Sequence, residues 1–107
     1  MEEVIKAIET SNKTFQIAEH YGLANQTEQL VEEMAELIVE IKHSKREEKV
    51  DFSNLLKELA DVEFMLEQVI FLLGCRDEIR AIKRKNADKM MEVIAKEKEH
   101  GIFPNSL

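Results

Sequence analysis

Two pairs of acidic residues, each pair three positions apart, are the side chains of this sequence best suited to chemistry. Glu33 and Glu36 come first, and Glu58 and Asp61 follow after a polar break. Side chains three positions apart on a helix point to the same side, so each pair can hold a cation between its carboxylates. Oxygen ligands without Cys or His suit Mg²⁺ or Mn²⁺. Because Mg²⁺ keeps positions open for water and phosphate oxygens, the pattern predicts a metal site for a phosphate-bearing substrate.

The specificity of this pattern differs between the two pairs. With 22 Asp and Glu among 107 residues, chance alone gives roughly four acidic pairs at this spacing. Glu33 and Glu36 lie away from the apolar side of their segment, so a solvated surface explains them equally well. Glu58 and Asp61 share an arc with Met65 in a segment that is apolar nearly all round. A carboxylate withdrawn from water there is costly unless it is paired or bound to a metal.

The elements that position these acids are all expected to be helices. Ala, Leu, Glu, Lys, Met and Ile dominate, and only three Gly and one Pro interrupt them. The apolar spacing predicts helices over residues 2–20, 27–43 and 53–73, and a fourth helix, capped by Asp77, that runs to about His100. We expect a single domain over residues 1–107, with one core of modest size.

Turn and capping residues separate these helices. Residues 20–27 (HYGLANQT) combine a Gly stop with Asn and Thr start signals. The polar connection over residues 44–53 offers Asp51 or Ser53 as an N-cap, and a glycine follows each of the last two helices. Two antiparallel helices joined by this connection would bring the acidic pairs face to face.

Composition and charge exclude several classes of function. A net charge of −7 and a pI near 5.0 argue against non-specific binding of nucleic acid and against docking on anionic membranes. The longest apolar run, VIFLL, is too short to cross a bilayer. The first residues lack the basic and apolar blocks of a signal peptide, and the single cysteine allows no internal disulfide. A cytoplasmic protein is expected.

The third helix carries more apolar surface than a chain of this length can readily cover. One broad apolar face and two smaller ones contain Leu55, Leu59, Val62, Leu66, Val69, Ile70 and Leu73, then Ala60, Phe64 and Phe71, then Met65 and Leu72. A helix that is apolar nearly all round is buried or faces another subunit. We therefore expect the chain to self-associate.

The acidic pairs, in this order and with these flanks, resemble the MazG-type all-α nucleoside triphosphate pyrophosphatases. The family motif is ExxE, a spacer and then ExxD, on adjacent antiparallel helices. Here it reads Glu33-Met-Ala-Glu36, twenty-one intervening residues, and Glu58-Leu-Ala-Asp61. The contexts LVEEMAEL and LLKELADV are similar to the family's EExxEL and EELxDv, and the likeness covers about residues 23–90.

The resemblance implies a MazG-like four-helix bundle in which Glu33, Glu36, Glu58 and Asp61 bind Mg²⁺. It implies hydrolysis of a nucleoside triphosphate between the α- and β-phosphates, giving the monophosphate and pyrophosphate. It also implies a homodimer or homotetramer with sites at subunit contacts. Mg²⁺ neutralises phosphate charge and activates the attacking water, whose proton Glu36 or Glu33 can accept.

Relatives often carry a Lys and an Asn on the following helix that reach the phosphates and the sugar. In KRKNADK, Lys83, Asn86 and Lys89 follow one another at three-residue spacing along one side of the predicted helix. The resemblance implies that they bind substrate, whereas a solvated face is the simpler interpretation of a Lys-rich segment.

The sequence also does not decide which residue would stack on the base. Some relatives stack the base on a Trp, which this sequence lacks. Phe15, His20 or Tyr21 could take that place, although each also fits packing in the core or at a helix end.

Two other classes of function remain. Glu40-x-x-His43 and Glu97-x-x-His100 match the ExxH element of di-iron bundles, but both fall in final helical turns, where the helix dipole alone favours His. A non-catalytic helical oligomerisation or regulatory module, whose acids only solubilise it, is the second. Binding of divalent metal separates that module from an enzyme.

Overall fold

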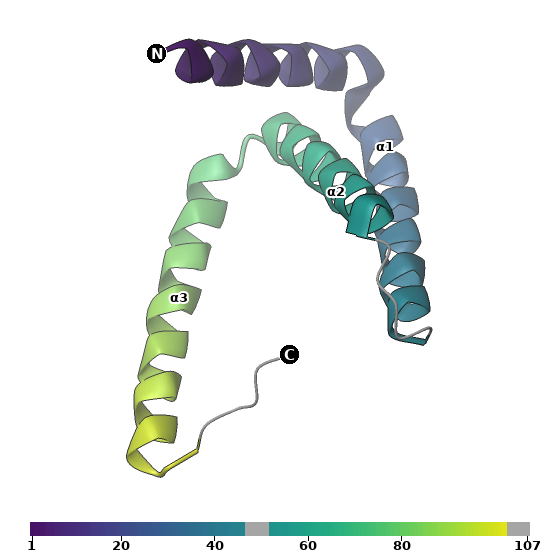
Figure 1. The fold of residues 1–107 in the computed structure, drawn as a ribbon. Coiled ribbons are helices and arrows are strands. Elements are labelled where there is room, and N and C mark those ends of the chain that lie inside the picture. Colours follow the sequence, from purple (N-terminus) through teal and green to yellow (C-terminus); the bar gives the residue numbers. More distant parts are fainter. Residues whose placement is uncertain (47–51, 103–107) are drawn as a thin grey trace. The chain divides into compact units, whose positions relative to one another are not determined.

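The computed structural model describes residues 1–46 and 52–102, with the backbone alone for 44–46. Its elements are α1 (Glu2–Arg46), α2 (Phe52–Leu73) and α3 (Arg76–Glu99), and the described residues include no strand (Figure 1). The prediction of an all-α chain is therefore confirmed.

The chain divides into two compact units, Met1–Gly74 and Cys75–Leu107. The first unit contains α1 and α2, and the second contains α3. None of the described helices is both long and apolar enough to cross a membrane.

The predicted break between the first two helices is a kink inside α1. Gly22 has φ +83° and ψ 167°, a backbone conformation that glycine adopts at little cost. The predicted start signals lie within the helix that continues beyond it. Asn25 Nδ2 donates to the carbonyl of Tyr21 at 2.8 Å, and Thr27 Oγ1 donates to that of Leu23 at 2.9 Å. Because both side chains bond back to the preceding turn, they do not cap a new helix.

The predicted C-terminal ends of the last two helices are confirmed. Gly74 and Gly101 follow α2 and α3 with φ of +63° and +72°. The amide of Gly101 donates to the carbonyl of Lys98, and the amide of Ile102 donates to that of Glu97 at 2.7 Å. These two bonds form a Schellman motif, which satisfies the last carbonyls of α3.

The predicted N-caps are not confirmed. Ser53 lies inside α2, and Asp51 lies outside the described residues. Asp77 lies in the first turn of α3, where Cys75 holds the N-cap position. An acidic side chain favours a helix N-terminus from the first turn as well as from the cap, so the sequence signal fits both positions.

The part of α1 after Gly22 runs antiparallel to α2 (Figure 1). Gln26 meets Gln68 at one end of the pair, and Glu40 meets Asn54 at the other. Closer to the N-terminus, the ring of Phe15 stacks on that of Phe71 with centroids 4.3 Å apart. Among the described side chains, the buried ones are Ala18, Val62, Met65 and Val69, together with the polar Thr14, Gln26, Glu40, Glu58 and Gln68. Polar side chains thus form much of the contact between these helices.

A pair of buried glutamines links α1 to α2. Gln26 Nε2 donates to Gln68 Oε1 at 2.7 Å, and Gln68 is completely buried. Its own amide lies 3.4 Å from the carbonyl of Phe64. A buried amide that loses its partner costs about 1–3 kcal/mol. We therefore expect this pair to fix the register of the two helices.

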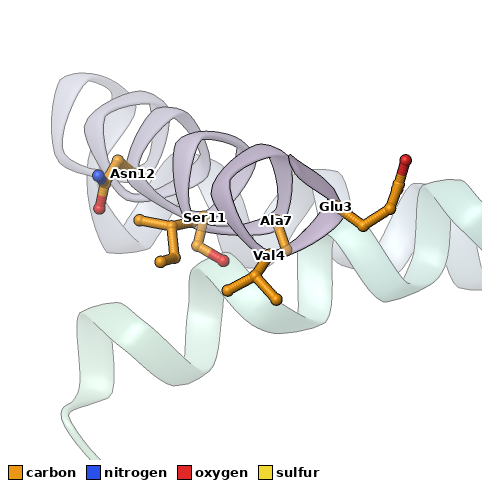
Figure 2. Close-up of a pocket in the computed structure, with 6 residues that line it drawn as sticks. Glu3, Val4, Ala7, Ser11 and Asn12 are labelled. Atoms are coloured by element: carbon orange, nitrogen blue, oxygen red, sulfur yellow. The ribbon is translucent and has the colours of Figure 1, made fainter. Parts of the chain in front are cut away.

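The apolar side chains near the start of α1 are largely uncovered. Val4, Ile5 and Ile8 are each about half exposed, at 55%, 49% and 56%. An open hollow on this side is lined by residues of α1 alone, and Figure 2 shows Val4, Ala7 and Ser11 along it. None of the predicted site residues lines this hollow.

Candidate metal centre

Three of the four predicted acids come together between α1 and α2. Glu33 and Glu36 from α1 and Glu58 from α2 each offer a carboxylate oxygen, and these atoms all lie within 4.8 Å of one another. In the part of the chain that the structure describes, no other group of three or more His, Cys, Asp or Glu residues meets in this way. We call Glu33, Glu36 and Glu58 the acidic group.

Burial differs within the acidic group. Glu58 is only 8% exposed, whereas Glu36 lies open to solvent. Glu58 Oε2 and Glu33 Oε2 are buried and have no hydrogen-bond partner. An orphaned buried carboxylate oxygen is expensive, more so beside other carboxylates. A divalent cation that prefers oxygen ligands would satisfy both atoms, so the residues present fit Mg²⁺ or Mn²⁺.

Repulsion among the carboxylates raises the pKa of Glu36. Its pKa is raised from the ordinary value of 4.5, first by the neighbouring carboxylate of Glu33, then by desolvation and by Glu58. The ammonium of Lys57 acts in the opposite direction and lowers this pKa. Like charges held close together favour the protonated form of one of them. Binding of a cation would remove that repulsion.

Asp61, the fourth predicted ligand, is outside the acidic group. Its Oδ2 lies 3.2 Å from Nζ of Lys57, which is also 3.6 Å from Glu58 Oε1. The pKa of Lys57 is raised, first by its hydrogen bond to Asp61 and then by the charges of Asp61 and Glu58. The sequence analysis did not single out Lys57. A signal was present, because LLKELADV has Lys where the family pattern EELxDv has its first Glu.

Glu40 is a further acidic residue next to the acidic group. A hollow lined by Glu36, Glu58, Ala35 and Val39 also includes Glu40. Glu40 is buried and accepts a hydrogen bond from Asn54 Nδ2. That bond crosses from α2 to α1 and steadies the helix pair next to the acids.

The histidines of the di-iron alternative do not join this centre. His43 and His100 are exposed, and neither belongs to a group of three or more potential ligands among the described residues. Glu97, the acid of the second ExxH pair, lies on α3 in the other unit. The di-iron hypothesis therefore finds no ligand set in the described part of the chain.

Another hollow lies between the acidic group and the kink in α1. Amide side chains line it, including Asn25, Gln26 and Gln29, together with the rings of Tyr21 and Phe64. Gln29 also connects this hollow to the acidic group, because its Nε2 donates to Glu33 Oε1 at 3.2 Å. We call this the amide-lined hollow.

The three aromatic candidates for base stacking have different surroundings. Tyr21 lines the amide-lined hollow and is 54% exposed. His20 meets the Tyr21 ring edge-on at 4.7 Å. Phe15 is stacked on Phe71 and so serves packing. Tyr21 is therefore the candidate with a ring available at the hollow.

The residues predicted to bind phosphate and sugar lie on α3. Lys83, Asn86 and Lys89 are all exposed on this helix, which has no buried residue. They belong to the second unit, and their approach to a substrate of the acidic group stays a prediction.

Comparison with protein-family models, with curated proteins and with solved structures finds no match for this chain. The relation to the MazG-type pyrophosphatases remains a resemblance of the acidic motif and its flanks. Any function assigned to the acidic group must therefore be argued from its own geometry and chemistry.

Proposed function

We propose that this protein is a Mg²⁺-dependent nucleoside triphosphate pyrophosphohydrolase of the MazG-like type that acts in the cytoplasm. It would cleave ribo- or deoxyribonucleoside triphosphates between the α- and β-phosphates, giving the monophosphate and pyrophosphate. One observation carries the proposal: carboxylates from two helices meet, and buried oxygens of Glu33 and Glu58 lack hydrogen-bond partners. A divalent cation resolves that cost, and phosphate oxygens complete the shell that Mg²⁺ prefers.

The acids of the chain have different tasks in this proposal. Bound Mg²⁺ would neutralise phosphate charge and lower the pKa of the attacking water. Glu58 is buried and would fix the position of the ion together with the nearby Glu33. Glu36 is exposed, so its carboxylate can reach a water molecule and accept the proton. Asp61 is the fourth ligand once it leaves Lys57.

The amide-lined hollow supports a nucleotide as the substrate. It adjoins the acidic group through Gln29 and offers the ring of Tyr21 for stacking and amides for the edge of a base. On α3, Lys83, Asn86 and Lys89 would supply the positive charge and the polar contacts that a triphosphate needs.

We further propose that the bundle is completed by other copies of the chain, as a homodimer or homotetramer. Support comes from the apolar residues of α2 that recur every seven positions and remain exposed: Phe52, Leu59, Leu66 and Leu73. An apolar stripe with this repeat is typical of helices that pair with another helix. Light scattering coupled to gel filtration would measure the mass in solution, and a monomer at all concentrations would contradict this part of the proposal.

The direct test is ³¹P NMR of a panel of NTPs and dNTPs incubated with the protein and Mg²⁺. The proposal predicts monophosphate and pyrophosphate, and the panel also ranks the bases and sugars. Release of orthophosphate would indicate a different phosphohydrolase. No turnover by folded protein, with Mg²⁺ and with Mn²⁺, would favour the non-catalytic oligomerisation module, which the exposed apolar faces also suit.

A further inference from the structure

We propose that Lys57 is a tethered counterion of the acidic group, which occupies Asp61 and one oxygen of Glu58 until a divalent cation takes its place. The inference rests on the proposed metal site and adds a regulatory residue to it. Lys57 would thereby set the affinity of the site for metal, and it would protect the fold while no metal is bound.

The position of Lys57 is the first observation. Its ammonium lies 3.2 Å from Asp61 Oδ2 and 3.6 Å from Glu58 Oε1, and so bridges the two acids of the second motif. Lys57 precedes Asp61 by one helical turn, which places both side chains on one side of α2. Among ion pairs between described residues, those of Lys57 are the ones that involve the predicted ligands.

The burial of Glu58 is the second observation. Its side chain is nine-tenths buried, and its other oxygen, Oε2, has no hydrogen-bond partner. Lys57 therefore compensates only one oxygen of this carboxylate, from the solvent side. One positive charge also cannot balance the three carboxylates of the acidic group. The remaining oxygen and the remaining charge are what a divalent cation would satisfy.

Exchange of the ammonium for a cation should be easy. The side chains of Lys57 and Asp61 are 65% and 38% exposed, and an exposed ion pair of this kind is weak. A divalent cation carries twice the charge and contacts carboxylate oxygens directly. Once Lys57 swings into solvent, Asp61 is free to complete the predicted set of four acids, which explains why only three of them meet here.

Neutralising Lys57 should therefore have two effects of opposite sign. The site binds metal more tightly, because no ammonium competes for Asp61 and Glu58. The metal-free protein becomes less stable, because the carboxylates lose their compensating charge. A lysine that only packs its stem against α2 would leave metal affinity unchanged. A lysine that holds substrate phosphate would raise KM for the nucleotide without tightening the binding of metal alone.

The test is calorimetric titration with Mn²⁺ alone, on wild type and on Lys57→Met, which keeps the length of the stem and removes the charge. We expect Kd for Mn²⁺ to fall by about two- to fivefold, the size of an exposed ion pair, together with a lower Tm without metal. Lys57→Arg keeps the charge and should stay near wild type. Lys96→Met removes an exposed charge from α3 and should change neither quantity.

Each outcome decides the question. Unchanged or weaker Mn²⁺ binding by Lys57→Met overturns the counterion role and leaves the proposed metal site intact. Absence of Mn²⁺ binding by the wild type would overturn the proposed metal site and the counterion role together. If Lys57→Met does not fold, Lys57→Gln provides the same comparison, with circular dichroism as the check on folding.

Discussion

The helices α2 and α3 are nearly equal in length, with 22 and 24 residues, yet they hold their polar residues in opposite ways. Five residues of α2 are buried, including Glu58 and Gln68, whereas no residue of α3 is. Glu58 and Gln68 are thus held in the contact with α1 before any ligand arrives. The polar groups of α3 are not buried, so they can be ordered by a substrate or by a second copy of the chain. In the proposed function, the acidic group would therefore bind the cation through a partly buried set of ligands, and the exposed residues of α3 would contact the nucleotide.

The largest effect should follow from removing the charge of Glu58. Glu58→Gln keeps the shape of the side chain and removes the carboxylate at the centre of the acidic group. Loss of several kcal/mol of electrostatic stabilisation corresponds to a fall in turnover of about a hundredfold or more. Initial rates of pyrophosphate release measure this, with helical content by circular dichroism expected to stay largely intact.

Glu63→Gln is the matched control, because Glu63 is exposed on the same helix. It should keep normal turnover. Asp61→Asn should also abolish turnover if Asp61 joins the ligands. Normal turnover in either Glu58→Gln or Asp61→Asn would remove that residue from the mechanism.

The next effect concerns the contact between α1 and α2. Gln68→Leu leaves the amide of Gln26 buried without its partner, and the free energy of unfolding should fall by about 1–3 kcal/mol. Urea denaturation gives this value.

Changing both glutamines to Leu should cost less than the sum of the single changes, because no unpaired amide remains. On α3, Lys85→Ala should stay within about 0.5 kcal/mol of wild type. A similarly small change for Gln68→Leu would refute the role of the buried pair.

A smaller effect is expected on α3. Lys83→Ala removes one exposed ammonium that we expect at the phosphates. KM should rise by about tenfold, which corresponds to the loss of a single charge-assisted hydrogen bond, while kcat should change little. Steady-state kinetics with the best substrate of the panel measure both constants. Lys96→Ala, on the last turn of the same helix, serves as the control. An unchanged KM for Lys83→Ala would exclude this role.

The smallest effect is a change in the pH dependence of stability. The pKa of Glu36 is raised in the folded chain, so its contribution to stability is present below its ordinary value of 4.5 and is lost as pH rises through the folded value. Glu36→Gln removes that loss. In metal-free protein, the Tm of Glu36→Gln should therefore rise relative to the Tm of wild type as pH increases from about 4 to 7. Glu32→Gln, an exposed change on the same helix, is the control. If the Tm of Glu36→Gln minus the Tm of wild type stays constant or falls as pH rises, the repulsion inferred among the carboxylates is contradicted.

The sequence predicted the helices well because their signals are local. Apolar spacing and the glycines at 74 and 101 act within one or two turns, and the corresponding helix ends are found in the structure. The arc shared by Glu58, Asp61 and Met65 also pointed to burial. Glu58 and Met65 are buried, whereas the side chain of Asp61 is 38% exposed. Asn25 and Thr27 do not begin a new helix as predicted, because a side chain that can cap a helix can equally bond back to the preceding turn.

Contacts between helices were harder to predict, because they depend on which side chain finds which partner. Gln68 lies on the same arc as Met65, and an amide in such an apolar arc was a signal for a buried partner. The choice of Asp61 between the acidic group and Lys57 is a competition between two nearby charges. The spacing along the chain puts Asp61 within reach of both the acidic group and Lys57, so it does not predict which of them Asp61 contacts.

The most direct test of the metal centre is thermal unfolding with increasing Mg²⁺, on wild type, Glu58→Gln and Glu63→Gln. A ligand at a hundred times its Kd stabilises the folded state by about 2.7 kcal/mol, which raises Tm by about 10–20 °C in a domain of this size. Wild type and Glu63→Gln should both show this rise, and Glu58→Gln should not. A wild-type Tm that does not respond to Mg²⁺ or Mn²⁺, or an equal rise in Glu58→Gln, would contradict a metal site at Glu33, Glu36 and Glu58.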